Sequence, residues 1–525
     1  MSDDTTPLAG PLAARFLRGV AVAPDRTAIR ARDGALTYAE LHERALRWAG
    51  ALLRAMPDGP GAAVGVLAGK GLDAYTGILA GLYAGVTVVP LSTEFPAART
   101  RQMLHAAGVA ALVTDERGYE LLPEILLNSA PGDAAMPVLC PSRAGGPFPR
   151  ISADGAHELA APRPVDRADP AYILFTSGST GRPKGVPISH AANDHYFQVL
   201  DARYDFTPDD AFSQTFDLNF DCAMFDMFCA WGAGACLVQV PASAYRDMPA
   251  FMARAGLTVW FSTPSAIALV RRTGGLAPAA MPGLRWSFFA GEALKCRDAD
   301  DWQQAAPTSA VENLYGPTEL TITCTAHRWD PEASPPRAVN GVVPIGGLHK
   351  GLEYLLLGPD GEPADGEGEL CVSGPQMTTG YLDPADAEGR FVERGSLTWY
   401  RTGDRVREVG GELAYLDRMD AQVQVRGWRI EPAEIDNELR SCPEIEDAVT
   451  VAATAGTEAE LVGFYTGRPV PAVELARRLR RTLPEPMIPR RFAHLAGFPL
   501  NPNRKIDRSA LLARANVMVG GSAAP

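Results

Sequence analysis

The sequence shows none of the features expected of a secreted or membrane-spanning protein. Its first ten residues, MSDDTTPLAG, contain no basic region followed by an apolar one, so no secretory signal is visible. The most apolar stretch, about residues 75–91, contains Gly, Thr and Pro and is typical of a buried helix followed by a buried strand. The eight cysteines include no CxxC pair. We therefore expect a cytoplasmic protein in a reducing environment.

An excess of basic charge is also missing. The chain carries 49 Lys and Arg against 62 Asp and Glu, which gives a formal net charge of −13. Binding along a phosphate backbone requires a basic surface, so we expect no nucleic acid among the partners. The lack of a spanning segment likewise predicts that no membrane is bound.

Cysteine and histidine are not grouped as metal ligands. Cys222, Cys229 and Cys236 recur every seven residues, which can place them along one side of a helix. No nearby His or further Cys completes a metal-ligand set. We interpret these three residues as buried structural thiols.

The chain does contain alternating strand and helix patterns, over a length that favours more than one domain. Its 525 residues exceed what one compact core usually holds. Segment 36–55 has helical periodicity and a Thr-x-x-Glu start that resembles a capping box. Residues 62–69 and 85–92 have the composition of buried strands, with a helix between them. Similar alternation runs from Ala171 to about residue 330.

The pattern changes in two other parts of the chain. Residues 130–169 are rich in Pro, Gly and Ala, and we interpret them as a surface loop. Residues 340–416 combine short strands with Gly turns, which indicates a small β-rich subdomain. A compact α+β unit follows, with strands near 422–428 and 446–454 and helices after them.

We therefore predict an α/β fold with a large N-terminal region of α/β layers plus a β-rich subdomain, and a small, mobile α+β C-terminal domain. The predicted boundaries are a core over 1–417, a hinge over 418–420, a mobile domain over 421–515 and a disordered tail over 516–525.

Segment 172–185, YILFTSGSTGRPKG, is the first candidate for chemistry. An apolar strand leads into a loop of hydroxyl and Gly residues that ends at Lys184. Such a loop can offer backbone N–H groups, hydroxyl donors and one positive charge to a triphosphate. The GxxxxGK[ST] spacing of a P-loop is absent. A flexible linker is the alternative, but the preceding strand and the lysine favour phosphate binding.

This loop resembles the signature of the adenylate-forming superfamily, which includes peptide-synthetase adenylation domains, acyl-CoA synthetases and luciferases. Further motifs of that family follow in order, and the resemblance covers about residues 36–512. They are FAGEAL (289–294), NLYGPTE (313–319), GELCVSGPQMTTGYL (368–382), YRTGD (400–404), LDRMDAQVQVRGWRIEPAEID (416–436) and NPNRKID (501–507).

The resemblance implies that ATP and Mg²⁺ are the cofactors. Tyr315 would stack on adenine, Asn313 would meet its amino group and Asp404 would bind the ribose hydroxyls. Thr318 would touch the α-phosphate, and Glu319 would hold Mg²⁺. Lys184 would be a catalytic residue together with Thr318 and Glu319. The other implied ATP-binding residues are Thr176, Ser177, Gly178, Ser179, Thr180, Gly291, Gly316 and Arg418.

Three C-terminal residues have implied roles in the catalytic cycle. Lys505 would stabilise the negative charge that develops as a carboxylate attacks the α-phosphorus and pyrophosphate leaves. Asp420 would be the hinge about which the small domain turns after adenylation. Gly427 would then line a tunnel for a pantetheine arm, where a side chain would obstruct close approach.

The segment 214–228, QTFDLNFDCAMFDMF, resembles the specificity region of amino-acid-activating members. Aligned on its FDMF sequence, the carboxylate for the substrate ammonium is Asp221; Asp217, in a second Phe-Asp pair, is a rival. The remaining lining is uncharged and bulky, which predicts a small or modest apolar amino acid. The other residues of this predicted pocket are Cys222, Phe225, Phe261, Phe288, Ala290, Leu314, Ile322 and Thr323.

The chain ends soon after NPNRKID, so we expect a free-standing adenylation enzyme of the nonribosomal-peptide type. Its acceptor would be the phosphopantetheine thiol of a separate carrier protein, with coenzyme A as the less favoured acceptor. An acyl- or aryl-CoA ligase is the alternative activity, although such enzymes typically lack the Asp221 carboxylate. A non-catalytic scaffold that binds carrier proteins and a luciferase-like oxidative activity are further alternatives.

Overall fold

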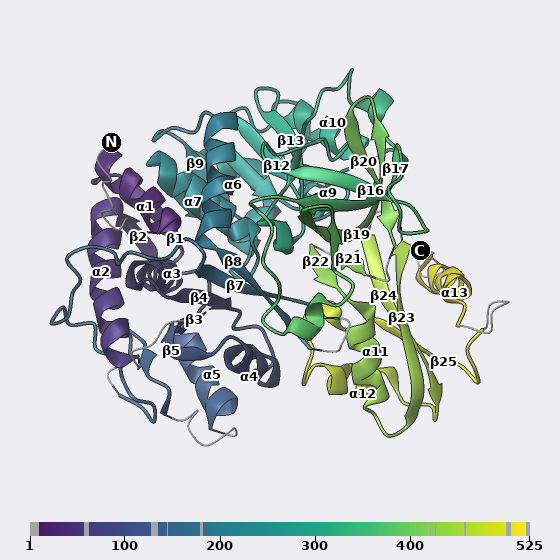
Figure 1. Ribbon diagram of the computed structural model, residues 1–525, viewed down its shortest axis with the longest axis horizontal. Helices are drawn as coiled ribbons and strands as arrows, with labels where there is room; N and C mark the ends of the chain where they lie inside the picture. Colours follow the sequence, from purple (N-terminus) through teal and green to yellow (C-terminus); the bar gives the residue numbers. More distant parts are fainter. Residues whose placement is uncertain are drawn as a thin grey trace. The chain divides into compact units, whose positions relative to one another are not determined.

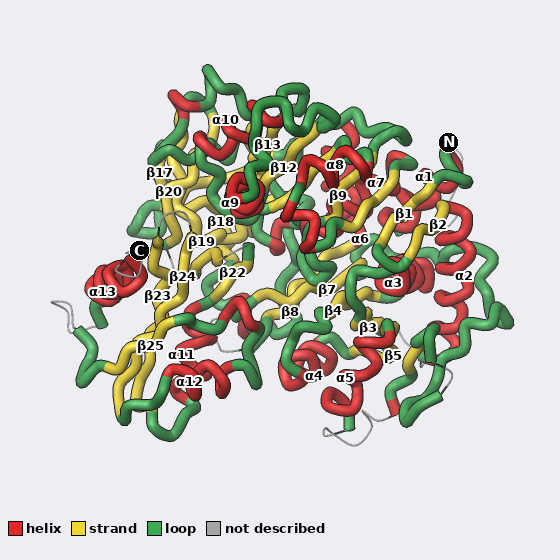
Figure 2. The backbone as a smooth tube through the Cα atoms, turned by 180° about the vertical axis from the view of Figure 1, so that it is seen from behind, coloured by secondary structure: helices red, strands yellow, loops and turns green. Residues whose placement is uncertain are grey.

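A computed structural model gives the fold of this chain (Figures 1 and 2). The chain forms two compact units, each assembled from segments that are distant in sequence. The first unit comprises residues 1–93, 103–175 and 185–417, and the second comprises 94–102, 176–184 and 418–525. The residues described are 10–56, 62–127, 135–143, 145–178, 182–419, 422–425, 427–455, 458–499 and 506–520.

One sheet has six strands in the order β6–β5–β3–β4–β7–β8. Every residue of β3 (Ala63–Leu67) and β4 (Thr87–Leu91) is buried, as expected for parallel strands covered on both faces. Helix α3 (Leu72–Ala84) connects them, which confirms the predicted strand–helix–strand unit. The remaining strands and two neighbouring helices are β5 (Val109–Thr114), β6 (Val138–Leu139), β7 (Pro170–Thr176), β8 (Lys184–Ser189), α4 (Ala97–Ala106) and α5 (Glu116–Leu126).

Helix α2 (Tyr38–Ala55) begins where the sequence pattern predicts. The Thr37 hydroxyl accepts a hydrogen bond from the Glu40 N–H at 3.2 Å, and the Glu40 carboxylate accepts one from the Thr37 N–H at 2.8 Å. The two bonds form the predicted capping box, which satisfies N–H groups that the first helical turn leaves without partners.

A second sheet has nine strands in the order β15–β14–β13–β12–β11–β9–β10–β1–β2. Alternate residues of neighbouring strands face opposite layers. Phe261 and Phe288 pack in the cluster that contains α7, whereas Trp260 and Phe289 pack in the cluster that contains α8, α9 and α10. In Figure 2 these three helices lie in front of the sheet. The sheet is therefore a middle layer between two sets of helices.

The strands of this sheet are β1 (Thr27–Ala31), β2 (Gly34–Thr37), β9 (Ala211–Gln214), β10 (Cys236–Gln239), β11 (Val259–Ser262), β12 (Trp286–Phe289), β13 (Ala310–Tyr315), β14 (Thr325–Arg328) and β15 (Gly347–Leu348). Their helices are α1 (Pro11–Val22), α6 (His190–Arg203), α7 (Cys222–Ala233), α8 (Met248–Ala255), α9 (Ser265–Arg272) and α10 (Cys296–Ala305).

The cysteine row corrects one expectation. Cys222 and Cys229 lie in α7 and are buried, but Cys236 begins β10 and is only partly buried. Gly234 ends α7 in a left-handed conformation with φ 74°, which a residue without a Cβ adopts readily. The seven-residue spacing therefore continues past the end of the helix. Among the described residues, no group of three or more His, Cys, Asp or Glu could hold a metal ion.

The predicted β-rich segment forms a five-stranded sheet in which β16, β17, β19 and β18 are successive neighbours and β20 pairs with β19. Its core contains Leu356, Leu370, Val372, Tyr400 and Val406. The strands are β16 (Glu353–Leu357), β17 (Glu367–Ser373), β18 (Phe391–Arg394), β19 (Leu397–Val409) and β20 (Glu412–Arg418).

In its described residues from 418 onward, the second unit contains a three-stranded sheet, a two-stranded sheet and three α-helices. Helix α13 packs on β23 through Leu511, Ala515 and Val519 (Figure 1). It continues through residues 516–520, the first part of the predicted disordered tail 516–525. The elements are β21 (Val423–Val425), β22 (Trp428–Ile430), α11 (Pro432–Arg440), β23 (Ile445–Ala455), β24 (Glu458–Gly467), α12 (Ala472–Leu479), β25 (Arg491–His494) and α13 (Arg508–Gly520).

No helix in the described part of the chain is both long enough and apolar enough to span a bilayer. The predicted α/β fold class is confirmed, as are the β-rich segment and the strands and helices expected after residue 422.

Candidate active site

Asp221, the predicted ligand of a substrate ammonium, directly precedes α7 and is partly buried. Burial raises the pKa of its carboxyl to about 6, although a hydrogen bond with the Thr318 side chain lowers it and the Glu319 carboxylate adds a smaller raising effect. A cation beside Asp221 would favour the ionised form. Asp221 therefore has the electrostatic setting of a carboxylate that gains a positively charged ligand.

The rival candidate Asp217 lies in a different environment. Its side chain is 52% exposed, and its carboxylate is 3.5 Å from the Lys70 ammonium. Asp217 already has a cationic partner, so the geometry favours Asp221 as the substrate residue, and this role stays a prediction.

Three predicted pocket residues form a triad of aromatic rings. Phe225 comes from α7, and Phe261 and Phe288 are register partners on the parallel strands β11 and β12. The Phe225 ring centroid lies 4.8 Å from that of Phe261 and 5.2 Å from that of Phe288, with the rings inclined edge to face. All three side chains are fully buried.

The remaining predicted pocket residues come from α7, from the segment that follows β12, from β13 and from the connection between β13 and β14. Cys222, Ala290, Leu314 and Ile322 belong to the same buried cluster as the three rings. The Thr323 hydroxyl is hydrogen-bonded to the Tyr196 hydroxyl at 3.0 Å. The predicted pocket residues thus come from five separate segments of the sequence and lie on the α7 side of the sheet.

Two residues predicted to bind the nucleoside contact each other directly. The Tyr315 hydroxyl donates a hydrogen bond to Asp404 Oδ2 at 2.6 Å. Burial and the Asp404 carboxylate hold the pKa of Tyr315 well above its usual range, so the phenol keeps its proton. This bond fixes one oxygen of Asp404 and the plane of the Tyr315 ring together.

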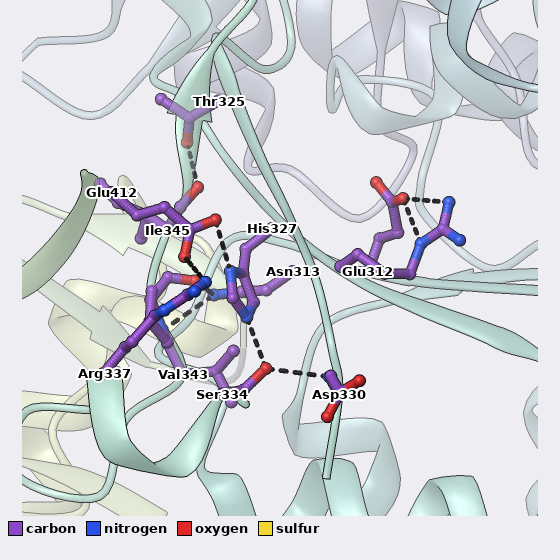
Figure 3. A network of polar contacts seen from close by, with 12 residues as sticks. Glu312, Asn313, Thr325, His327, Asp330, Ser334, Arg337, Val343, Ile345 and Glu412 are labelled. Atoms are coloured by element: carbon purple, nitrogen blue, oxygen red, sulfur yellow. Dashed lines mark hydrogen bonds and ion pairs between the residues drawn. The ribbon is translucent and has the colours of Figure 1, made fainter. Parts of the chain in front are cut away.

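Asn313 is oriented by the backbone beside it (Figure 3). Its amide nitrogen donates hydrogen bonds to Val343 O at 3.3 Å and Pro344 O at 2.9 Å. Because both amide protons point to carbonyl groups, Oδ1 is the atom that can accept a hydrogen bond from an adenine amino group. In Figure 3 the Thr325 hydroxyl also donates a hydrogen bond to Ile345 O at 2.6 Å. Thr325 lies on β14, next to the strand β13 that carries Asn313.

Gly316 has a structural requirement of its own. A Cβ at this position would lie 2.6 Å from the Thr323 Cα and 2.8 Å from the Cys324 nitrogen. The Cys324 N–H donates a hydrogen bond to Tyr315 O at 2.7 Å, so the chain reverses tightly here. Close backbone packing is therefore sufficient to explain why a glycine is required at position 316, and no contact with a nucleotide is needed. Gly291 has φ 84°, in the region that favours glycine.

Glu319 is the predicted Mg²⁺ ligand, and its side chain is almost fully buried. Tyr381 donates a hydrogen bond to Glu319 Oε1 at 2.7 Å, and the Thr378 N–H donates one to the Glu319 carbonyl at 2.8 Å. A single hard carboxylate fits Mg²⁺, which usually binds one or two carboxylates together with phosphate oxygens and water. Both bonds hold Glu319 in place.

Ser177 and Gly178 of the signature loop belong to the second unit, where residues 429–434 form hydrogen bonds with them. The Ser177 hydroxyl donates to Arg429 O at 2.7 Å and accepts from the Glu431 N–H at 3.1 Å. The Gly178 N–H donates to Glu434 Oε2 at 3.3 Å. Glu434 is also ion-paired with Arg99, and both side chains are buried. A carboxylate thus binds an N–H group that was predicted to bind phosphate.

Other predicted residues of this unit have simpler surroundings. The Thr176 hydroxyl is buried without a hydrogen-bond partner among the described residues, Lys184 is buried and Gly427 has φ 80°. Arg418 ends β20. Four predicted residues lie outside the described part of the chain, namely Ser179, Thr180, Asp420 and Lys505.

Sequence reasoning missed Gln376, Tyr381 and Glu434. Gln376 and Tyr381 lie in GPQMTTGYL, a motif that was recognised without a role for its side chains. Glu434 lies in RIEPAEID, which contains three acidic residues, and the sequence does not show which of them pairs with the loop. Motif order could have pointed to these segments, but the partner of each side chain is set by the fold.

The profile of a family described as "AMP-binding enzyme" matches residues 16–382, well over half of the chain. The chain belongs to this family. The predicted membership of the adenylate-forming superfamily is therefore confirmed.

Individual relatives match almost end to end. The chain is 32% identical over 510 residues to the L-proline–[L-prolyl-carrier protein] ligase of Pseudomonas fluorescens, covering 95% of this chain and 98% of the relative. It is 54% identical to IdnL7, whose crystal structure matches with a TM-score of 0.76 over 98% of this chain and 100% of that one. The Vibrio cholerae adenylation domain AlmE, solved with glycyl-adenosine-5'-phosphate, is 27% identical, with a TM-score of 0.84 and coverage of 98% and 99%.

The hydrogen bond between Tyr315 and Asp404 generates a testable prediction. We expect Tyr315→Phe to weaken AMP binding by about tenfold, because a bond to a carboxylate is worth about 1.5 kcal/mol or more. Titration calorimetry with AMP measures the change. The matched control is Tyr354→Phe, which removes a Tyr–Glu408 hydrogen bond of 2.8 Å on the exposed face of the β-rich sheet. An equal loss in both variants would contradict this assignment.

Proposed function

We propose that this chain activates a small apolar amino acid with ATP and transfers the aminoacyl group to the phosphopantetheine thiol of a separate carrier protein. The observation that carries the proposal is the partly buried Asp221 carboxylate at the start of α7, the helix whose Phe225 ring belongs to the aromatic triad. Asp221 would bind the α-ammonium, and the rings would leave room only for a short side chain. The amino acid in the name of one relative, proline, and the glycyl adenylate bound in the structure of another support a small amino acid.

The first step joins the amino acid to AMP. A carboxylate oxygen of the bound amino acid attacks the α-phosphorus of ATP, a new C–O–P linkage forms, and the bond to pyrophosphate breaks. Thr318 would contact the α-phosphate, and Lys505 would stabilise the charge that develops there. When bound to Glu319, Mg²⁺ would neutralise charge on the phosphate oxygens.

The nucleotide would be held by Asn313, Tyr315, Asp404 and Arg418. Tyr315 would offer its ring face to adenine while its hydroxyl fixes Asp404 for the ribose. The signature residues from Thr176 to Lys184 would bind the departing phosphates.

The second step transfers the acyl group. The carrier thiol attacks the carbonyl carbon of the aminoacyl adenylate, a thioester forms, and AMP leaves. We propose Asp420 as the hinge between the two steps, and Gly427 as a residue that lets the pantetheine arm pass.

Amino-acid-dependent exchange between ATP and pyrophosphate tests the first step. Across a panel of amino, aryl and fatty acids, we expect exchange with a small apolar amino acid such as alanine. Lys505→Ala should reduce exchange by about 100-fold or more, because it removes a cation from the transition state. Exchange only with an aryl or fatty acid would replace the proposal with an acyl- or aryl-CoA ligase. No exchange with any acid would favour a non-catalytic role.

Asp221→Asn should raise the KM for the amino acid about 100-fold, because a buried charge pair loses one partner, roughly 3 kcal/mol. The pKa of about 6 also sets a pH dependence. The carboxylate is ionised above that pH, so kcat/KM for the amino acid should fall tenfold per unit below it in the native enzyme. The Asn variant should lack this fall. Asp217→Asn is the matched control; a larger effect at Asp217 would move the ammonium site there.

The two faces of β12 give a paired test of pocket size. Phe288 faces the α7 cluster and Phe289 faces the opposite cluster, and both are fully buried. We expect Phe288→Leu to raise kcat/KM for a larger apolar amino acid, relative to alanine, by about tenfold, the effect of one or two carbon groups in an apolar pocket. Phe289→Leu should lower the unfolding temperature without changing this ratio. An unchanged ratio in Phe288→Leu would remove this ring from the pocket.

A further inference from the structure

The turn between β13 and β14 contains an unusual backbone conformation. Thr321 and Ile322 have φ angles of 59° and 69°, in the left-handed region that favours glycine. Both are β-branched, so their side chains crowd the backbone in this conformation. Both are also buried. Such a conformation persists only where the surrounding structure holds it, and it is concentrated at functional sites.

Gln376 holds this turn from both sides. Its amide nitrogen donates to Leu320 O at 3.1 Å and to Thr323 O at 2.8 Å, the carbonyl groups that flank the two left-handed residues. In return, the Thr321 hydroxyl donates to Gln376 O at 2.6 Å. The Gln376 side chain is 0% exposed, so water cannot replace these bonds.

His349 sets the orientation of the Gln376 amide. Burial lowers the pKa of His349 to about 4, so its imidazole is neutral near pH 7. Its Nδ1 lies 3.2 Å from Gln376 Oε1 and can donate to it in one tautomer. The His349 ring lies 5.8 Å from the Tyr196 ring, and the Tyr196 hydroxyl is bonded to Thr323. One polar contact and one ring contact therefore connect Gln376 through His349 and Tyr196 to Thr323 in the same turn.

This turn carries residues from both halves of the proposed site. Ile322 and Thr323 belong to the predicted amino-acid pocket, and Glu319 is the predicted Mg²⁺ ligand. Two further residues of the segment that contains Gln376, Thr378 and Tyr381, bind the backbone and side chain of Glu319. One segment therefore positions both groups.

We propose that Gln376 is a positioning residue that holds Thr321 and Ile322 in the left-handed conformation and thereby sets the discrimination between amino acids of different size. The inference rests on the proposed function and extends it to a residue that touches neither substrate.

The test compares two glutamines that make the same kind of contact. Gln376→Met keeps the length of the side chain but removes the amide. The control is Gln303→Met, because Gln303 also donates to two backbone carbonyls, Ala306 O at 3.1 Å and Ser309 O at 2.9 Å, beside α10. Both variants leave carbonyl groups without donors, so both should lose stability.

Only Gln376→Met should change specificity. We expect a rise of about tenfold in the KM for the preferred amino acid, a smaller change in kcat, and a comparable loss of discrimination against an amino acid one methylene longer. Pyrophosphate exchange at several amino-acid concentrations gives these values. Unchanged KM and discrimination in Gln376→Met, or the same change in Gln303→Met, would overturn the proposal.

A second variant separates conformation from loss of packing. In Thr321→Gly combined with Gln376→Met, the glycine adopts a positive φ without crowding, so part of the KM increase should be reversed. A purely structural role predicts a further loss, because glycine removes a buried side chain; that result would also overturn the proposal. The native enzyme distinguishes the two hypotheses. If it activates only a non-amino acid, the proposed function fails. The role of Gln376 is then tested by the same KM and discrimination measurements with that acid.

Discussion

The tight reversal between β13 and β14 is the constraint on which the candidate site depends. The two strands are antiparallel, with Tyr315 opposite Thr325, so the chain must leave and return at one place. Gly316 permits the close approach of the two backbone segments, and the left-handed residues complete the turn. Glu319 and Ile322 lie three positions apart within the connection 316–324, so they are neighbours regardless of how the rest of the sheet is built. Proximity of the predicted metal-binding residue and the predicted pocket residue is thus a property of one turn.

Local patterns were predictable because their causes are local. The apolar composition of β3 and β4 and the Thr37–Glu40 capping box depend on neighbours within a few residues. The Phe-Phe sequence at 288–289 shows the limit of this reasoning. Two adjacent aromatic residues reveal that a strand is buried on both faces, but only the packed layers determine which ring faces α7.

The parts that could not be predicted depend on contacts distant in sequence. Gln376 supports a turn more than fifty positions earlier, and Glu434 binds Gly178 across 256 positions. Neither pairing leaves a periodic signal. The Asp221 register was ambiguous for a related reason: two Phe-Asp pairs stand close together in the sequence, and they differ in burial and partners, which sequence spacing does not record. The burial of Cys236 was misjudged because Gly234 ends the helix, whereas the seven-residue spacing continues past it.

The composition of the second unit has a consequence for engineering. Arg99, Ser177 and Gly178 belong to this unit although they precede its main segment by hundreds of residues. A chimera that exchanges only residues 418–520 with a relative would keep the buried Arg99 and replace its partner Glu434 with the relative's residue, so Arg99 would lose its counter-ion wherever that residue is not acidic. The exchangeable piece is therefore discontinuous. Recombination between relatives would have to transplant all three segments together, and a single crossover near residue 417 would divide one packing unit between two parents.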